Sequence, residues 1–131
     1  MEQLQKAMRS HRLVSCALTF GAVIFYNCFG FPIYNLTKEW PFFITAEYVF
    51  LGISAAVIAG GFLAGLFPQK RLYFIVPLTL FLSLAGLGCR YLLEFGEVSN
   101  THNFTPSNIA LHLIVFTVIS AFTWSEQINR T

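Results

Sequence analysis

The sequence contains no aspartate, and only 11% of its 131 residues are charged. Soluble domains carry about 25% charged residues, so this composition excludes an ordinary water-soluble domain. The eight Lys and Arg residues are scattered and partly offset by six Glu residues, so they form no basic face for nucleic acid. The chain is also too short for a large soluble catalytic domain beside a membrane part.

Sequence motifs for catalysis, phosphate binding and metal binding are absent as well. The chain has no GxSxG, no HExxH and no glycine-rich phosphate loop. Its three cysteines form no CxxC pair and no zinc-ligand spacing. His112 is the only histidine within an apolar run, which disfavours a bis-histidine haem. We therefore expect no metal, no cofactor and a non-enzymatic protein.

Long apolar runs dominate what is present, since 56% of the residues are hydrophobic and 17% are aromatic. A helix needs about 20 mostly apolar residues to cross a bilayer. The chain offers four such runs, over residues 13–34, 41–67, 72–95 and 106–124. Thr105 and Pro106 read as an N-cap followed by proline in the first turn of the last run. The prediction is an all-α integral membrane four-helix bundle, forming one transmembrane domain over residues 1–131.

Basic residues gather in the three segments that share one side of a four-span protein. These residues are Lys6, Arg9, Arg12, Lys70, Arg71 and Arg130. Only Lys38 lies in an opposite loop, so the positive-inside rule predicts that both termini are cytoplasmic. The first run is too long for a cleaved signal peptide. Residues 1–12 are either an amphipathic extension near the lipid headgroups or a frayed polar tail.

Small residues recur along the second run, and such faces let helix backbones approach closely in lipid. They are Ala56, Gly60, Gly61, Ala64 and Gly65. Because the turn from Pro68 to Arg71 is short, we predict that the second and third helices are antiparallel neighbours that pack through this face. A homodimer built on the same face is the alternative.

Each run also carries a strongly polar side chain near its external end. At about 1.5 Å per residue, Asn27, Glu47, Arg90 and His112 lie about 7–10 Å below that end. Glu94 follows Arg90 by one turn, so we expect Arg90 to pair with Glu94 and, across the interface, with Glu47. This polar layer is either a network that fixes helix register or a pocket open to the outside. We expect His112 to be structural, bound to a carbonyl or to Glu47, rather than a proton relay.

The favoured function is that of a small non-enzymatic protein of a bacterial cytoplasmic membrane, which contacts a partner membrane protein laterally. Small accessory subunits and immunity proteins against pore-forming toxins have this build. One alternative is an oligomeric transport or channel subunit whose path follows the polar layer. A second is a small membrane enzyme acting on a lipid or quinone.

The Asn-x-Thr sequons at Asn35 and Asn103 leave a eukaryotic endomembrane location open. The lipid bilayer and a second copy of the chain are further expected partners.

Overall fold

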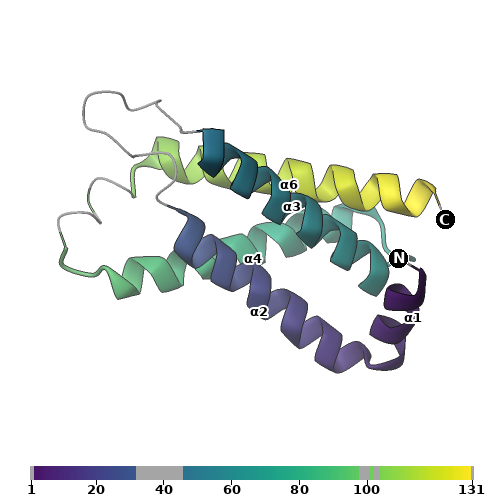
Figure 1. Cartoon of the computed structure of the whole chain (residues 1–131). Coiled ribbons are helices and arrows are strands. Elements are labelled where there is room, and N and C mark those ends of the chain that lie inside the picture. Colours follow the sequence, from purple (N-terminus) through teal and green to yellow (C-terminus); the bar gives the residue numbers. More distant parts are fainter. Residues whose placement is uncertain (1, 32–45, 98–100, 102–103, 131) are drawn as a thin grey trace.

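The computed structural model describes residues 2–31, 46–97, 101 and 104–130, with only the backbone described for residues 2, 5 and 46–49. Every regular element in these ranges is a helix (Figure 1). The helices are α1 (Glu2–Ser10), α2 (Arg12–Gly30), α3 (Ala46–Leu66), α4 (Leu72–Leu93) and α6 (Pro106–Asn129). The predicted all-α class is therefore confirmed.

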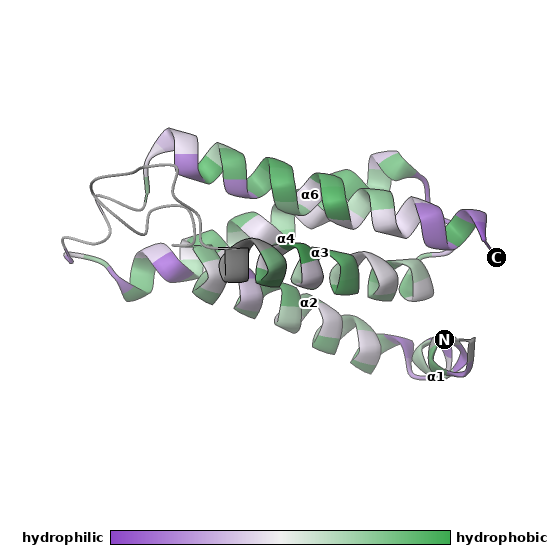
Figure 2. Ribbon diagram, turned by 45° about the horizontal axis from the view of Figure 1, so that its top comes forward, coloured by the Kyte–Doolittle hydropathy of each residue, from purple (hydrophilic) through white to green (hydrophobic). Residues whose placement is uncertain are grey.

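Three of these helices, α2, α4 and α6, are long and apolar enough to cross a membrane. The fourth, α3, contributes a shorter apolar stretch over Phe50–Leu66. Figure 2 shows apolar residues along the middle of the long helices and hydrophilic ones near their ends. This distribution is typical of a membrane protein.

The ends of α3, α4 and α6 follow from local chemistry. The Thr105 side chain accepts a hydrogen bond from the Asn108 amide at 3.3 Å, and Pro106 opens the first turn of α6, which confirms the predicted N-cap. α3 stops at Leu66, two residues before Pro68, because proline cannot continue a helix. Beyond α4 the chain turns at Gly96, whose φ is +87°, a conformation that glycine adopts without strain.

The four long helices pack in an order that differs from their order in the chain. α3 makes its most extensive contact with α6, and α2 with α4. α4 also packs against α6, whereas α2 and α3 touch less. Each of the two close pairs is parallel, since both of its members run toward the same end of the bundle (Figure 1).

The prediction that α3 packs against α4 is wrong, because the small-residue face of α3 meets α6 instead. A Cβ placed on Gly60 would lie 2.7 Å from Cβ of Thr123 and against the Ser120 carbonyl. The Ser120 hydroxyl also donates to the Ala56 carbonyl at 3.1 Å. A short turn keeps the ends of α3 and α4 close, but it does not decide which faces meet.

The remaining small residues of α3 have other surroundings. A Cβ added at Gly61 would meet no described atom within 4 Å. Ala64 is buried in a cluster that includes Met8 of α1, and the Gly65 carbonyl accepts a hydrogen bond from Nε of Arg9 at 3.5 Å. Gly65 therefore supports the docking of α1, and Ala64 lies in a cluster that α1 shares with Ile75 of α4 and Trp124 of α6.

The second close pair depends on Gly86 of α4. A Cβ at this position would lie 2.5 Å from Cβ of Asn27 and 2.6 Å from the Ile24 carbonyl oxygen, both on α2. Only a residue without a side chain allows this approach. Gly60 and Gly86 thus permit the close approach within the two most extensive helix contacts of the bundle.

α1 packs across one end of the bundle and is seen nearly end-on in Figure 2. Its Met8 is 7% exposed and joins a core cluster with Leu63 and Trp124. The Trp124 indole donates to the Phe67 carbonyl at 3.4 Å beside this cluster. The N-terminal segment is therefore a docked amphipathic helix rather than a frayed tail.

Neighbouring glycines of α3 give a matched test of the α3–α6 crossing. Gly60→Ala should lower the stability of the folded protein by about 1–3 kcal/mol, because its Cβ overpacks the interface. Gly61→Ala adds the same methyl group into open space and should leave the stability unchanged. Thermal unfolding in mild detergent measures both variants. Equal melting temperatures for the two would contradict the crossing.

Candidate functional site

The centre of the polar layer is a buried hydrogen bond between α2 and α6. Asn27 is 0% exposed and His112 is 2% exposed. Nε2 of His112 lies 2.7 Å from Oδ1 of Asn27, and the Asn27 amide nitrogen donates to the Val23 carbonyl at 2.8 Å. Since that nitrogen is engaged as a donor, the Asn27 oxygen accepts, and His112 donates from Nε2.

Aromatic rings enclose this pair. Phe31 meets the His112 ring edge-on with centroids 5.5 Å apart, and Phe116 stacks on it at 6.4 Å. Tyr26 stacks in turn on Phe116 at 5.6 Å, and Phe104 packs on Phe31 at 4.6 Å. The imidazole is therefore held in one orientation by its hydrogen bond and by the rings of Phe31, just after α2, and Phe116 of α6.

Arg90 and Glu94 form a separate ion pair along α4, as their i, i+4 spacing predicts. Their side chains are 19% and 14% exposed, and they lie at the C-terminal end of the helix, where a cation is favoured by the helix dipole. Among the described residues, Nε of Arg90 and Oε2 of Glu94 have no hydrogen-bond partner. The Glu47 side chain lies outside the described residues, so its pairing with Arg90 stays a prediction.

The polar layer therefore divides into two pairs instead of a single cluster of described side chains. Depth counting placed Asn27 and His112 at one level, and the structure brings them together. Their direct bond was not predicted, because nothing in the sequence indicates that α2 and α6 face each other across the bundle centre. The signal that identifies the pair is their common depth combined with their amide and imidazole chemistry.

Buried hydroxyl groups are a second feature that the sequence analysis missed. The residues concerned are Thr19, Thr79, Ser83, Thr117 and Ser120. Thr79 donates back to the Ile75 carbonyl of its own helix at 2.7 Å, whereas Ser120 bonds across to α3. The hydroxyl oxygens of Ser83 and Thr117 have no partner among the described residues. Most of these groups follow spacings of three or four residues along one helix face, which is the pattern that could have revealed them.

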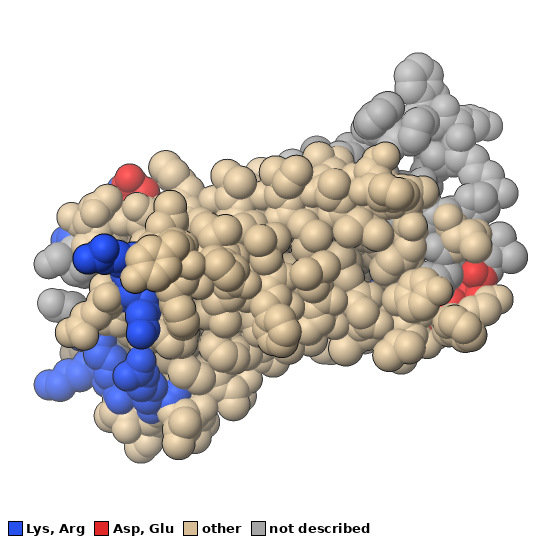
Figure 3. Space-filling view, turned by 180° about the vertical axis from the view of Figure 1, so that it is seen from behind, with Lys and Arg blue, Asp and Glu red and all other residues tan. Residues whose placement is uncertain are grey.

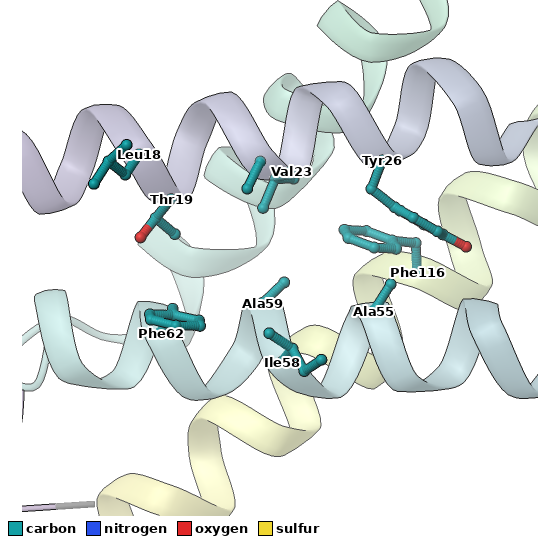
Figure 4. Close-up of a pocket in the computed structure, with 10 residues that line it drawn as sticks. Leu18, Thr19, Val23, Tyr26, Ala55, Ile58, Ala59, Phe62 and Phe116 are labelled. Carbon is teal, nitrogen blue, oxygen red and sulfur yellow. The ribbon is translucent and has the colours of Figure 1, made fainter. Parts of the chain in front are cut away.

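A lateral groove of about 530 Å³ opens between α2 and α3, where those helices make their lesser contact (Figure 4). Its lining includes the small residues Ala22, Ala55 and Ala59 as well as larger ones such as Phe62 and Tyr26. Phe116 of α6 closes the back of the groove. Neither Asn27 nor His112 lines it, so the groove and the polar pair are distinct features.

Within the described ranges, no three metal-ligating side chains come together. The imidazole of His112 is directed at the Asn27 amide oxygen. The candidate site therefore consists of two features, the α2/α3 groove and the internal polar pair.

The Asn27–His112 bond is testable by a double-mutant cycle. Asn27→Leu and His112→Phe should each lower stability by about 1–3 kcal/mol, because each leaves a buried polar partner unsatisfied. The double variant should lose less than the sum of the single losses. Thermal unfolding in detergent provides the values, with Asn129→Leu at the exposed end of α6 as a control without effect. Additive losses would show that the two side chains are energetically independent.

Neither a protein-family model, nor a curated protein, nor a solved structure matches this chain. A helical bundle does not by itself imply a function. The function therefore has to be inferred from the groove, the polar pair and the distribution of charge.

Proposed function

We propose that the chain is a four-span integral membrane protein of a bacterial cytoplasmic membrane, and that it acts without catalysis by lateral contact with another membrane protein. The helix α3 has 21 residues, or about 31 Å at 1.5 Å per residue, which matches the hydrocarbon core of a bilayer. With α3 counted as a span, α2, α3, α4 and α6 cross the bilayer in alternating directions (Figure 1).

The distribution of charge supports cytoplasmic termini. Figure 3 shows Lys and Arg side chains gathered at the end of the bundle that carries α1. The end of α6 and the turn between α3 and α4 lie at that same end (Figure 1). Since cytoplasmic segments are enriched in Lys and Arg, this end faces the cytoplasm in the proposed topology.

The α2/α3 groove is the observation that carries the proposed contact. The three alanines in its lining permit the close backbone approach by which helices associate in lipid. Apolar side chains are also exposed on both helices, with Phe25 65% exposed on α2 and the lining residue Ile58 58% exposed on α3. An apolar transmembrane helix of a partner fits this combination of small and bulky apolar side chains.

The internal polar pair supports this function over a transport path along the polar layer. A path for ions or polar solutes requires side chains that reach water, whereas Asn27 and His112 are enclosed by aromatic rings and bonded to each other. An enzyme acting on a lipid or quinone requires a reactive group in contact with an apolar substrate. The polar side chains that line the groove are those of Thr19 and Tyr26, and no carboxylate or imidazole is among its described lining residues.

Reporter fusions test the topology. A reporter enzyme that is active only outside the cytoplasm should be silent when fused after Thr131 and active when inserted after Gly96, because the C-terminal end of α6 and Gly96 lie at opposite ends of the bundle. Expression is checked by immunoblotting. A strong signal from the Thr131 fusion would show that the topology is reversed or that one of the four helices does not cross the membrane.

Photocrosslinking tests the lateral contact with a matched pair of positions on α2. A photoreactive residue in place of Ala22, which lines the groove, should crosslink in cells to one membrane protein, identified by mass spectrometry. The same residue in place of Ala17, which is also exposed but lies outside the groove, should give no such product. A crosslink to this same chain would indicate a homo-oligomer, and crosslinks to lipid alone would contradict the proposal.

A further inference from the structure

A second pocket lies at the end of the bundle that carries α1. It is lined by several basic side chains, whereas the lining of the groove is mainly apolar. It has a volume of about 390 Å³ and is lined by side chains from three segments: the end of α1, the start of α2 and the turn between α3 and α4. Three of the lining residues, Arg9, Arg12 and Lys70, are cations. Gln69 adds a neutral amide.

Each of the three cations makes a contact with the body of the protein. Arg9 bonds from Nε to the Gly65 carbonyl at 3.5 Å, near the C-terminal end of α3. The Arg12 guanidinium lies 5.8 Å from the centre of the Phe67 ring, and the Lys70 ammonium lies 5.1 Å from that of Phe74. Phe67 is itself buried, and Met8 anchors α1 beside Arg9. The backbone segments that carry the three exposed cations are therefore fixed by buried neighbours, Met8 on α1 and Phe67 after α3.

No carboxylate neutralises these cations among the described side chains. The ion pairs found in the described ranges join Arg90 to Glu94 and Arg130 to Glu126. The described lining of the pocket includes no acidic residue. Three like charges in one pocket repel one another, so an external anion that enters it relieves this repulsion as well as forming its own bonds.

The position of the pocket relative to the ends of the helices indicates which anion it binds. α2 begins at Arg12, α3 ends at Leu66 and α4 begins at Leu72, so the pocket lies where the apolar helices end. In a bilayer this is the level of the lipid headgroups, whose phosphates are the most abundant anions there. Guanidinium groups donate paired hydrogen bonds to phosphate oxygens, and an ammonium contributes a point charge.

We propose that this pocket binds the phosphate headgroup of an anionic phospholipid, with Arg9, Arg12 and Lys70 as its ligands. The two arginines donate to the phosphodiester oxygens, and Lys70 provides charge from the α3–α4 turn. The bound lipid links α1 to that turn, so it fastens the N-terminal helix to the bundle. The site rests on the proposed membrane location but not on the partner contact proposed for the groove, and the two proposals fail independently.

The test is a lipid titration of the purified full chain in detergent, followed by its melting temperature and by native mass spectrometry. Phosphatidylglycerol should raise the melting temperature and stay bound, and phosphatidylcholine with the same acyl chains should do neither. Lys70→Gln should weaken phosphatidylglycerol binding about tenfold, the loss expected for one charge-assisted interaction. Lys70→Arg should retain binding, because it keeps the charge.

Arg71→Gln is the matched control, since Arg71 follows Lys70 in the same turn but does not line the pocket. It removes one positive charge and should leave binding unchanged. Equal losses in Lys70→Gln and Arg71→Gln would overturn the proposal by showing diffuse attraction without a site. Protection by inorganic phosphate in the absence of any lipid effect would also overturn it, as would equal binding of the two lipids.

Discussion

The structure depends on how closely two pairs of helices approach each other. In a bilayer, helices gain little from hydrophobic association, because lipid chains are as apolar as their side chains, so contact depends on dense packing. Gly60 and Gly86 have no side chain, so they let α3 come close to α6 and α4 come close to α2. Because these contacts draw α3 and α2 toward different neighbours, the α2–α3 side is left with the lesser contact. The open groove between α2 and α3 is thus a consequence of tight packing elsewhere in the bundle.

Hydropathy alone predicted where the helices lie, with errors at their ends that have a physical origin. α4 starts at the predicted residue 72 and ends at Leu93, two residues early. α6 continues to Asn129, five residues beyond the predicted limit, because its last turns are polar and include the Arg130–Glu126 pair. Apolarity marks the part of a helix that suits lipid, whereas backbone hydrogen bonding decides where the helix stops. The pairing of the helices was not predictable in this way, since a small-residue face fits any other helix that offers a matching surface.

The candidate sites also differ in how far the sequence alone predicts them. The Arg90–Glu94 pair follows from spacing along one helix, so the sequence is sufficient to predict it. Asn27 and His112 were identified as strongly polar residues at a similar depth in apolar runs. To predict the bond between them, one must also know that α2 and α6 face each other. The basic pocket needs still more, because Arg9 and Lys70 are far apart in the chain and meet only when α1 folds across the end of the bundle. Predictability thus falls as the number of separate segments in a site increases.

The parallel pairing also constrains the biogenesis of the chain. The main packing surface for α3 and the imidazole bonded to Asn27 both lie on α6, which follows α2, α3 and α4 in the chain. Until it arrives, the Ala56–Gly60 face borders lipid, and the Asn27 oxygen has no imidazole to accept from. A chain in which α6 has not yet docked is therefore marked by an uncovered small-residue stripe and by an Asn27 oxygen without its imidazole donor, and both signals disappear once α6 docks. A membrane chaperone or protease that recognises such polar, loosely packed helices would distinguish chains with and without a docked α6 without contacting any loop.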